Sequence, residues 1–336
     1  MSKPIVFFGE LLIRLTARGH ELLMQSPSLN LHVGGAEANV AVGLANLGHA
    51  CRMVSRVPDN ALGRGAAAAI RAQGVDCARV STGKGRMGLY FLSVGAGLRA
   101  SEIIYDRAGS SFARAKADDF DWDALLAGAG MLHLSGITPA LGPQSAEATL
   151  AAARAAKRLG VPISFDGNYR AMLWEVWDSD PRAILSELIG MTDILFGNHR
   201  DLSLVLGRDF SDNGADRRRE AAEAGFAAFP SLSLIASTAR QTVSADHHRI
   251  AARIDMREGA HQSDEIDVTS IVDRIGAGDA FAAGVLHASL RGGDAEAMAE
   301  SGLALTCLKH SLPGDASLFG QADIEAFQSG GLDVRR

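Results

Sequence analysis

Short apolar runs alternate with helical segments along most of the chain, and this alternation constrains the fold more than any other feature. The runs at 5–9, 51–57 and 130–136 each fit a buried strand, and apolar residues at helical spacing lie between such runs. Strands joined by helices pair in parallel, because each helix crosses over and covers one face of the sheet. We therefore expect an α/β fold with a central, mostly parallel sheet covered on both faces.

The individual elements can be placed from the same pattern. Glycines at 48 and 160 stand where a helix commonly ends. We expect strands at 5–9, 51–57, 130–136, 161–168, 192–198 and 231–237, and helices at about 34–48, 61–74, 144–160, 181–190, 277–291 and 294–309.

Two stretches interrupt the alternation. Residues 11–33 and about 86–110 contain strand-like segments, such as MGLYFLSV and SEIIYDR, without an intervening helix. They predict a small β-sheet lid built from two insertions. With only 9 prolines and no low-complexity tract, the chain shows no flexible linker. We expect one domain over 1–336 that carries this lid.

Composition excludes several classes of protein. The chain has 336 residues, 39 acidic and 33 basic, a net charge of −6, and no Lys/Arg-rich block, so nucleic acid is a poor partner. No long apolar window lacks charge or glycine, and the first residues do not resemble a secretory signal, so we expect a soluble, cytoplasmic protein without a membrane span. Cys51, Cys77 and Cys307 lie far apart and are expected to be small buried side chains.

The most specific motif is a Gly-Ala-Gly turn at 276–278 that leads into an apolar helix. Gly276 and Gly278 allow the backbone to approach a ligand, and the free amides of a helix N-terminus attract an anion. Asp279 then has two interpretations, a carboxylate that stabilises its own helix or a base beside an anion hole. The third glycine of a dinucleotide fingerprint is missing, so a nicotinamide dehydrogenase fits poorly.

Polar residues also follow two neighbouring strands. Asp166, Asn168 and Arg170 come directly after the strand expected at 161–168, and Asn198 ends the next one. Ligands bind at the carboxyl ends of strands in parallel α/β sheets, so these residues form either a structural network or a binding site.

Two further segments are ambiguous when each is taken alone. Gly34 and Gly35 precede a helix that carries Asn39, which fits either an ordinary helix entry or a close approach to a polar ligand. In the lid, Tyr105 and Arg107 are two residues apart and share one face of a strand. A phenol beside a guanidinium suits a substrate with hydroxyls and a carboxylate, although an exposed strand face is the simpler alternative.

Taken in order, these segments resemble the ribokinase-like (PfkB) carbohydrate kinase family over nearly the whole chain. Residues 34–48 match its N-terminal Gly-Gly…Asn signature and 273–284 match its GAGD signature. The implied fold is a ribokinase-like three-layer sandwich with a central, mostly parallel sheet and a small β-sheet lid. The chain looks most like the 2-keto-3-deoxygluconate kinases of the family, on the basis of matches at 88–90, 105–110, 132–141, 168–174 and 308–315.

The resemblance implies roles for particular residues. Asp279 is the implied catalytic base, and the backbone of Gly276, Ala277 and Gly278 is the implied anion hole. The implied substrate-binding residues are Gly34, Gly35, Asn39, Tyr90, Tyr105, Arg107, Asn168 and Arg170. The implied nucleotide-binding residues are Asn198, Ser237, Thr238 and Arg240, and Asp201 is an indirect candidate for binding metal.

The activity that follows is transfer of the γ-phosphoryl group of ATP, with Mg²⁺, to the terminal hydroxyl of 2-keto-3-deoxygluconate (2-dehydro-3-deoxy-D-gluconate), giving the 6-phosphate. Arg107 and Arg170 would pair with the substrate carboxylate, and a neutral sugar would leave them underpaired. The family often dimerises through its lid, so we expect a homo-oligomer, a dimer in the first instance.

Three departures from the family pattern keep alternatives open. The Asn-x-x-Glu motif ends in Asp201, the usual Asp-Thr-x-Gly has Arg274 at its second position, and the nucleotide loop expected at 237–246 has no glycine. A kinase for another sugar, such as fructose or a related sugar acid, is one alternative. A sugar-acid-binding pseudokinase is another.

Overall fold

A large central sheet organises the protein. The computed structural model describes residues 3–211 and 214–330. In this part of the chain the sheet has ten strands in the order β13-β12-β11-β10-β9-β8-β1-β4-β5, with β14 paired to β12. Neighbouring strands from β11 to β5 pair in parallel, and β12 pairs antiparallel with β11, β13 and β14. The strands are β1 (Ile5–Phe8), β4 (Cys51–Pro58), β5 (Asp76–Gly83), β8 (Met131–Ser135), β9 (Ile163–Asp166), β10 (Ile194–Phe196), β11 (Leu234–Ser244), β12 (His247–Met256), β13 (Ala260–Gln262) and β14 (Ile266–Thr269).

Helices cover both faces of this sheet and produce two separate cores. Successive residues of β1 alternate between them, with Ile5 and Phe7 in one core and Val6 and Phe8 in the other, as the period of a strand requires. The first core includes residues of α1 (Ala36–Asn46), α2 (Ala61–Ala72), α9 (Ala277–Leu290), α10 (Ala295–Lys309) and α11 (Gln321–Gln328). The second includes residues of α3 (Trp122–Leu126), α4 (Pro143–Leu159), α5 (Ala171–Trp174), α6 (Pro181–Gly190), α7 (His199–Leu206) and α8 (Ala215–Ala228). The predicted three-layer α/β fold is confirmed.

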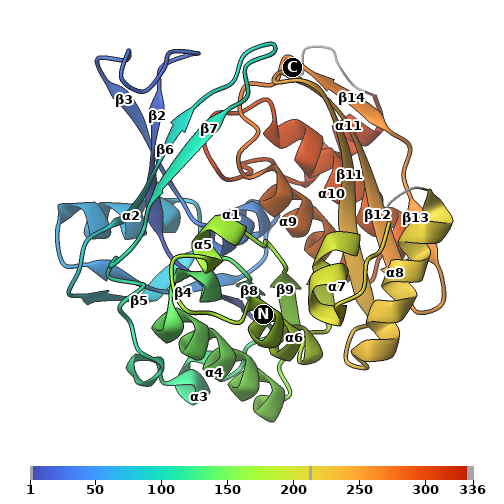
Figure 1. Ribbon diagram of the computed structural model, residues 1–336, viewed down its shortest axis with the longest axis horizontal. Helices are drawn as coiled ribbons and strands as arrows, with labels where there is room; N and C mark the ends of the chain where they lie inside the picture. The colour runs from blue at the N-terminus through green and yellow to red at the C-terminus, as the bar shows by residue number, and fades with distance from the viewer. Residues whose placement is uncertain (1–2, 212–213, 331–336) are drawn as a thin grey trace.

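A second, four-stranded sheet stands apart from these layers at the upper left of Figure 1. Its order is β3-β2-β6-β7, formed by β2 (Leu12–Ala17), β3 (Leu29–Gly34), β6 (Gly88–Ser93) and β7 (Glu102–Asp106). The two interruptions of the strand–helix alternation therefore do form one small sheet.

The expectation of a loop at 237–246 is wrong. β11 continues through this segment to Ser244 and pairs antiparallel with β12 over its whole length. Ser237 lies opposite Arg253, and Thr238 lies opposite Ala252. A long antiparallel hairpin satisfies the backbone groups of the segment, so no glycine-rich turn is required there.

The three cysteines behave as the sequence predicts. Cys51, Cys77 and Cys307 are free and buried, and burial raises their thiol pKa values to about 12, about 11 and about 12.

Among the described residues, we find no helix with the length and apolar character needed to cross a membrane.

Candidate active site

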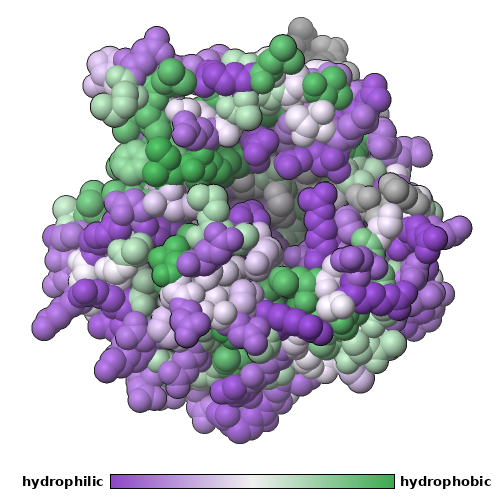
Figure 2. Space-filling model, in the orientation of Figure 1, coloured by the Kyte–Doolittle hydropathy of each residue, from purple (hydrophilic) through white to green (hydrophobic). Residues whose placement is uncertain are grey.

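A cleft of about 1050 Å³ lies between the small sheet and the carboxyl ends of the central strands. Figure 2 shows this face of the molecule hollowed below the small sheet, with hydrophilic side chains along part of the border. Asp166 at the end of β9 and Gly197 just after β10 both line it. The cleft thus occupies the edge of a parallel sheet where ligands bind.

The N-terminus of α9 opens onto this cleft. Gly276 precedes the helix with a φ of 78°, and a Cβ there would lie 1.6 Å from the backbone oxygen of Asp315. Glycine is therefore required at this position for both conformation and space. At Gly278, by contrast, a Cβ would meet no atom within 4 Å. The first-turn amides have no carbonyl partner within the helix, so they can bind an anion in the cleft. The amide of Ala277 also makes a long hydrogen bond of 3.4 Å to the backbone oxygen of Arg274.

Asp279 stands in this first turn, partly accessible from the cleft. Its Oδ2 accepts a hydrogen bond of 2.7 Å from Nδ2 of Asn39. Burial raises the pKa of Asp279 to about 8 against the effect of that hydrogen bond, and the nearby carboxylates of Asp166 and Asp315 add to the rise. Oδ1 of Asn39 is buried without a partner among the described residues. Asp279 and Asn39 both line the cleft, so the carboxylate and the amide that holds it lie at its surface.

The lid side of the cleft is lined by aromatic and basic residues. Tyr90, Tyr105 and Arg107 lie on or next to β6 and β7. Arg170 lines the cleft from the central sheet, where it follows β9. Arg170 donates to the backbone oxygen of Tyr169 at 3.0 Å and forms no ion pair with any described residue. Its charge acts on the nearby carboxylates of Asp166 and Asp201, and without an ion pair it can also bind an anionic group of a ligand.

Arg107 differs from what the sequence suggests. Its Nε donates to Oε2 of Glu10 at 2.7 Å, and both side chains are almost fully buried. Ser110 also donates to this carboxylate, and the absence of a side chain at Gly88 makes room for it. The charge of Arg107 is therefore already neutralised, and the expectation of two free cations is wrong for this residue.

Gly34 is the one predicted substrate-binding residue that does not line the cleft. It packs instead against the carboxylate of Asp315, where a Cβ would lie 2.5 Å from Oδ2. The same carboxylate oxygen accepts a hydrogen bond of 2.5 Å from the hydroxyl of Tyr90. Gly34 therefore packs against Asp315, which lines the cleft, and does not itself line the cleft.

The opposite side of the cleft is formed by β11 and the start of α7. Ser237, Thr238 and Arg240 line it from the strand, and Asn198 lines it from the helix N-terminus. Burial, followed by the charges of Arg274 and Arg170, lowers the pKa of Arg240. The guanidinium groups of Arg240 and Arg274 form no ion pair with any residue between 3 and 211 or between 214 and 330. This side of the cleft suits a strongly anionic ligand.

Two carboxylates lie where these two sides meet. Burial raises the pKa of Asp166 to about 7, and the charge of Asp201 adds to it. Burial also raises the pKa of Asp201, whose Oδ2 caps the backbone amide of Asn198 at 2.8 Å. Mg²⁺ in nucleotide sites is commonly held by one or two carboxylates together with phosphate oxygens. Asp166 and Asp201 fit such an ion, and no cluster of three or more potential ligands occurs in the described ranges.

Sequence reasoning missed several charged residues next to this site. Their shared property is burial, and each is paired to a residue far away in the chain. Arg14 carried a usable signal, since a charged residue inside the apolar strand LIRLTA requires a buried partner. The missed residues are Glu10, Arg14, Asp273, Lys309 and Asp315.

The family signature extends over nearly all of the protein. The profile described as pfkB family carbohydrate kinase matches residues 2–318. The chain belongs to this family. This sugar kinase carries the family's GAGD motif at the N-terminus of α9, beside the cleft just described.

Individual relatives agree with the assignment. The kinase is 30% identical over 331 residues to a 2-dehydro-3-deoxygalactonokinase of Haloferax volcanii, with 98% of each chain covered. Its sequence is 36% identical to that of a 2-dehydro-3-deoxygluconokinase from Thermotoga maritima. The crystal structure of that protein matches with a TM-score of 0.92 over 97% of this chain and 99% of the other. A fructokinase from Xylella fastidiosa with bound ATP shares the fold at 19% identity, with a TM-score of 0.79 and coverage of 99% and 100%. A sugar and ATP are the small-molecule partners that the family implies.

Proposed function

We propose that this kinase transfers the γ-phosphoryl group of ATP to the terminal hydroxyl of a 2-keto-3-deoxy sugar acid. 2-Keto-3-deoxygluconate is the first candidate, and its 6-phosphate is the product. The observation that carries the proposal is the unpaired Arg170 in the same cleft as Asp279 and the amides of α9. The names of the Haloferax and Thermotoga relatives support this substrate class, with galactonate and gluconate forms as the two nearest choices.

Recognition of an acid is the part of the proposal that depends on charge. Arg170 would pair with the substrate carboxylate, while Arg107 retains N–H groups that can donate although Glu10 balances its charge. The hydroxyls of the acid would meet Tyr105 and Asn39, which both line the cleft. A neutral sugar would leave Arg170 without an anionic partner, and this difference favours the acid.

The chemistry then depends on this chain's own groups. Asn39 holds the Asp279 carboxylate, which accepts the proton of the attacking hydroxyl. The amides of Gly276, Ala277 and Gly278 receive the equatorial oxygens of the transferring group. Phosphoryl transfer needs positioning and charge neutralisation more than covalent assistance, and both are built into the start of α9.

ATP and Mg²⁺ would occupy the other side of the cleft. Asn198, Ser237, Thr238 and Arg240 are the proposed nucleotide-binding residues, with Arg274 added from the structure. Asp166 and Asp201 would hold Mg²⁺, which when bound neutralises charge on the phosphates. Asp201 is a shorter carboxylate than the glutamate usual at this position, and its oxygen also caps α7, so contact through water fits best.

The organisation of the protein is part of the proposal. We treat it as one cytoplasmic catalytic domain in which residues of about 11–33 and 86–110 form the lid. One face of the lid carries an apolar row of residues that lie opposite one another across its four strands: Leu31, Leu15, Phe91 and Ile104. Leu31 and Ile104 are 54% and 48% exposed. This row supports a dimer formed through the lid, and Leu31→Glu with Ile104→Glu should yield monomers by light scattering.

A kinase for a neutral sugar such as fructose is the second candidate. The neutralisation of Arg107 by Glu10 favours it, because Arg170 is then the one proposed substrate-binding cation without an ion pair to a described residue. The pseudokinase alternative rested on the missing glycine-rich loop and on Asp201, and the segment expected to form that loop is part of the β11–β12 hairpin.

A substrate panel tests the proposal. Purified protein with ATP and Mg²⁺ is offered 2-keto-3-deoxygluconate, 2-keto-3-deoxygalactonate, fructose and ribose, and ADP release is measured. We expect the highest kcat/KM for one of the two acids. Faster turnover of fructose or ribose would contradict the acid assignment, and absence of ADP release with every sugar would support the pseudokinase.

Arg170→Met provides the matched variant. It should raise KM for the acid and leave KM for a neutral sugar unchanged. Arg154→Met, which removes an exposed arginine paired to Glu187 on the helical surface, is the control and should change neither constant.

A further inference from the structure

Four charged residues form a buried cluster next to the anion hole. They are Arg14, Asp273, Lys309 and Asp315, each 6% exposed or less. Nη2 of Arg14 donates to Oδ2 of Asp273 at 2.6 Å, and its Nε forms an ion pair with Oδ1 of Asp315 at 3.1 Å without hydrogen-bond geometry. Two cations and two anions therefore balance in a largely buried region, and of the four only Asp315 lines the cleft. Although burial opposes its charge, Asp315 and Asp273 hold the pKa of Arg14 above its ordinary value.

Two members of the cluster fix the backbone on both sides of the Gly276 turn. The Asp273 carboxylate accepts the amide of Ile275 at 3.0 Å and that of Gly314 at 3.0 Å. Lys309 donates to the backbone oxygens of Asp273 at 3.3 Å and Leu312 at 3.0 Å. The segment before α9 and the segment after α10 are thus tied together through side chains.

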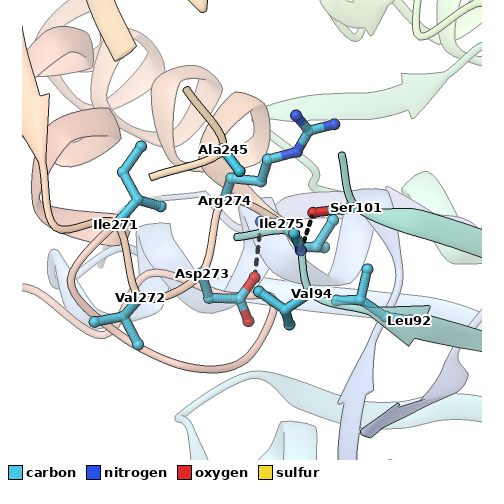
Figure 3. A pocket seen from close by; sticks show the side chains of 10 residues that line it. Leu92, Val94, Ser101, Ala245, Ile271, Val272, Asp273, Arg274 and Ile275 are labelled. Carbon is cyan, nitrogen blue, oxygen red and sulfur yellow. Dashed lines mark hydrogen bonds between the residues drawn. The ribbon is translucent and has the colours of Figure 1, made fainter. Parts of the chain in front are cut away.

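The other two members join this frame to the lid. Arg14 belongs to β2, where it lies beside Tyr90 of β6 in the sheet register. Tyr90 donates its hydroxyl to Asp315, whose backbone oxygen packs against Gly276. Figure 3 shows the same neighbourhood, with Leu92 and Val94 next to the segment from Ile271 to Ile275 and a hydrogen bond from the Ile275 amide to Asp273.

Such a cluster is an unusual way to stabilise a protein. Removing charges from water costs about as much as their mutual attraction returns, so apolar residues would serve stability equally well. Lys309 even lacks a carboxylate within ion-pair distance among the described residues and is held by carbonyl oxygens instead. What the cluster supplies is directional: each charge fixes a specific backbone or side-chain group at the cleft.

We propose that Arg14 and Asp315 are positioning residues of the kinase, which through Asp273 and Lys309 hold the Gly276–Gly278 amides in register with Tyr90 on the lid. The proposal rests on the proposed function for its catalytic consequence, since only phosphoryl transfer requires this register. It makes the base of the lid a fixed part of the catalytic frame, so that any opening of the lid must occur farther out along its strands.

The test uses a pair of substitutions that preserves the charge balance. In Arg14→Met with Asp315→Asn, Asp273 and Lys309 remain as one anion and one cation, and the amide can still accept from Tyr90. Misplacement of reacting groups by about 1 Å can cost on the order of 100-fold in rate, so we expect kcat to fall at least about tenfold. Arg154→Met with Glu187→Gln, an exposed pair joining α4 and α6, is the matched control and should leave kcat within about twofold.

Two readouts separate positioning from a general loss of structure. Hydrogen exchange of the peptide 274–284 should accelerate in the double variant, while the peptide 144–159 in α4 should exchange as in the wild type. Tyr90→Phe should lower kcat in the wild type and have little further effect in the double variant, because the register it depends on is already lost. Arg14→Ala alone should regain activity with added guanidinium but not with sodium chloride of equal ionic strength.

Two results of these experiments would overturn the proposal. A double variant that keeps kcat within about twofold of the wild type overturns the proposal. So does a loss of kcat accompanied by faster exchange in both peptides, because that result means a structural role only. Kinetics use whichever sugar the substrate panel shows to be turned over, and exchange needs no sugar. Failure of the 2-keto-3-deoxy acid assignment therefore leaves this test intact.

Discussion

The two sides of the cleft are prepared for their ligands in different ways. On the lid side, two of the polar groups are already paired within the protein: Arg107 with Glu10 and Tyr90 with Asp315. On the side of β11, Arg240 and Arg274 have no ion-pair partner in the described part of the chain. The lid side therefore offers a ligand donors and acceptors whose positions are already fixed. On the opposite side, an anionic ligand would neutralise the charges of the two arginines.

This contrast has a physical reason. Sugars differ in the orientation of single hydroxyls, and discrimination between them needs donors and acceptors that do not move. A triphosphate is recognised mainly by charge, which acts over a longer distance and tolerates variable side-chain positions. The absence of a glycine-rich nucleotide loop is consistent with recognition of this second kind.

The largest effect is expected at the point where the two sides meet. Asp279→Asn removes the proposed base but keeps a side chain that can bond to Asn39. General base catalysis contributes about 10² to 10⁴ in rate, so kcat should fall by at least about 100-fold. Sugar binding by calorimetry should change little. A variant that retains kcat within about tenfold would remove the base role.

Glu10→Gln tests whether the lid side is really prepared in advance. Breaking a buried ion pair by removing one partner leaves Arg107 as an unpaired charge, which costs about 3–5 kcal/mol. We expect a loss of this size in the free energy of unfolding, measured with urea. Glu187→Gln, which breaks the exposed pair with Arg154, should cost at most about 1 kcal/mol. Equal losses in the two variants would contradict the comparison.

Substituting Arg240 and Arg170 one at a time should separate the binding of ATP from the binding of the sugar. Arg240→Met should raise KM for ATP about tenfold, as expected for one charge-assisted hydrogen bond of about 1.5 kcal/mol or more, and leave KM for the sugar unchanged. Arg170→Met should do the reverse with an acid substrate. If both variants alter both constants alike, the cleft is one undivided electrostatic site.

A smaller effect concerns stability and pH in the absence of ligands. The pKa of Asp279 in the folded protein, about 8, lies above its ordinary value of 3.8. The stability that protonated Asp279 contributes is complete below about pH 4 and is lost as the pH rises toward 8. Asp279→Asn has no such loss. Its melting temperature relative to wild type should therefore increase between pH 5 and pH 8 and then level off. A constant difference over this range would show that the carboxylate is not shifted.

The sequence could predict what depends on neighbouring residues. The small sheet followed from a break in a regular alternation, and Asp279 from a turn of three residues next to a helix. The family resemblance added distant positions, and of those predicted for binding or catalysis all except Gly34 line the cleft. Asn39 and Asp279, 240 residues apart, are joined by one hydrogen bond.

What escaped prediction depends on long-range packing. Arg14 and Asp273 are separated by 259 residues, and Glu10 and Arg107 by 97, so no local pattern connects them. The partner of a buried charge is decided only when the lid folds onto the central sheet. For the same reason, the availability of Arg107 could not be judged from its position beside Tyr105.

At several positions next to the cleft, a neighbouring carboxylate leaves no room for a side chain, and this is why glycine is required there instead of for a turn. A Cβ at Gly88 would meet Glu10, one at Gly34 would meet Asp315, and one at Gly9 would meet Glu37. In each case a missing methyl group accommodates an acid that holds a cleft residue or lies beneath the site. During divergence to a new substrate, such a glycine and its acid can change only together. New specificities are therefore more accessible by replacing the tyrosines and arginines that face the ligand, and directed evolution should concentrate its libraries there.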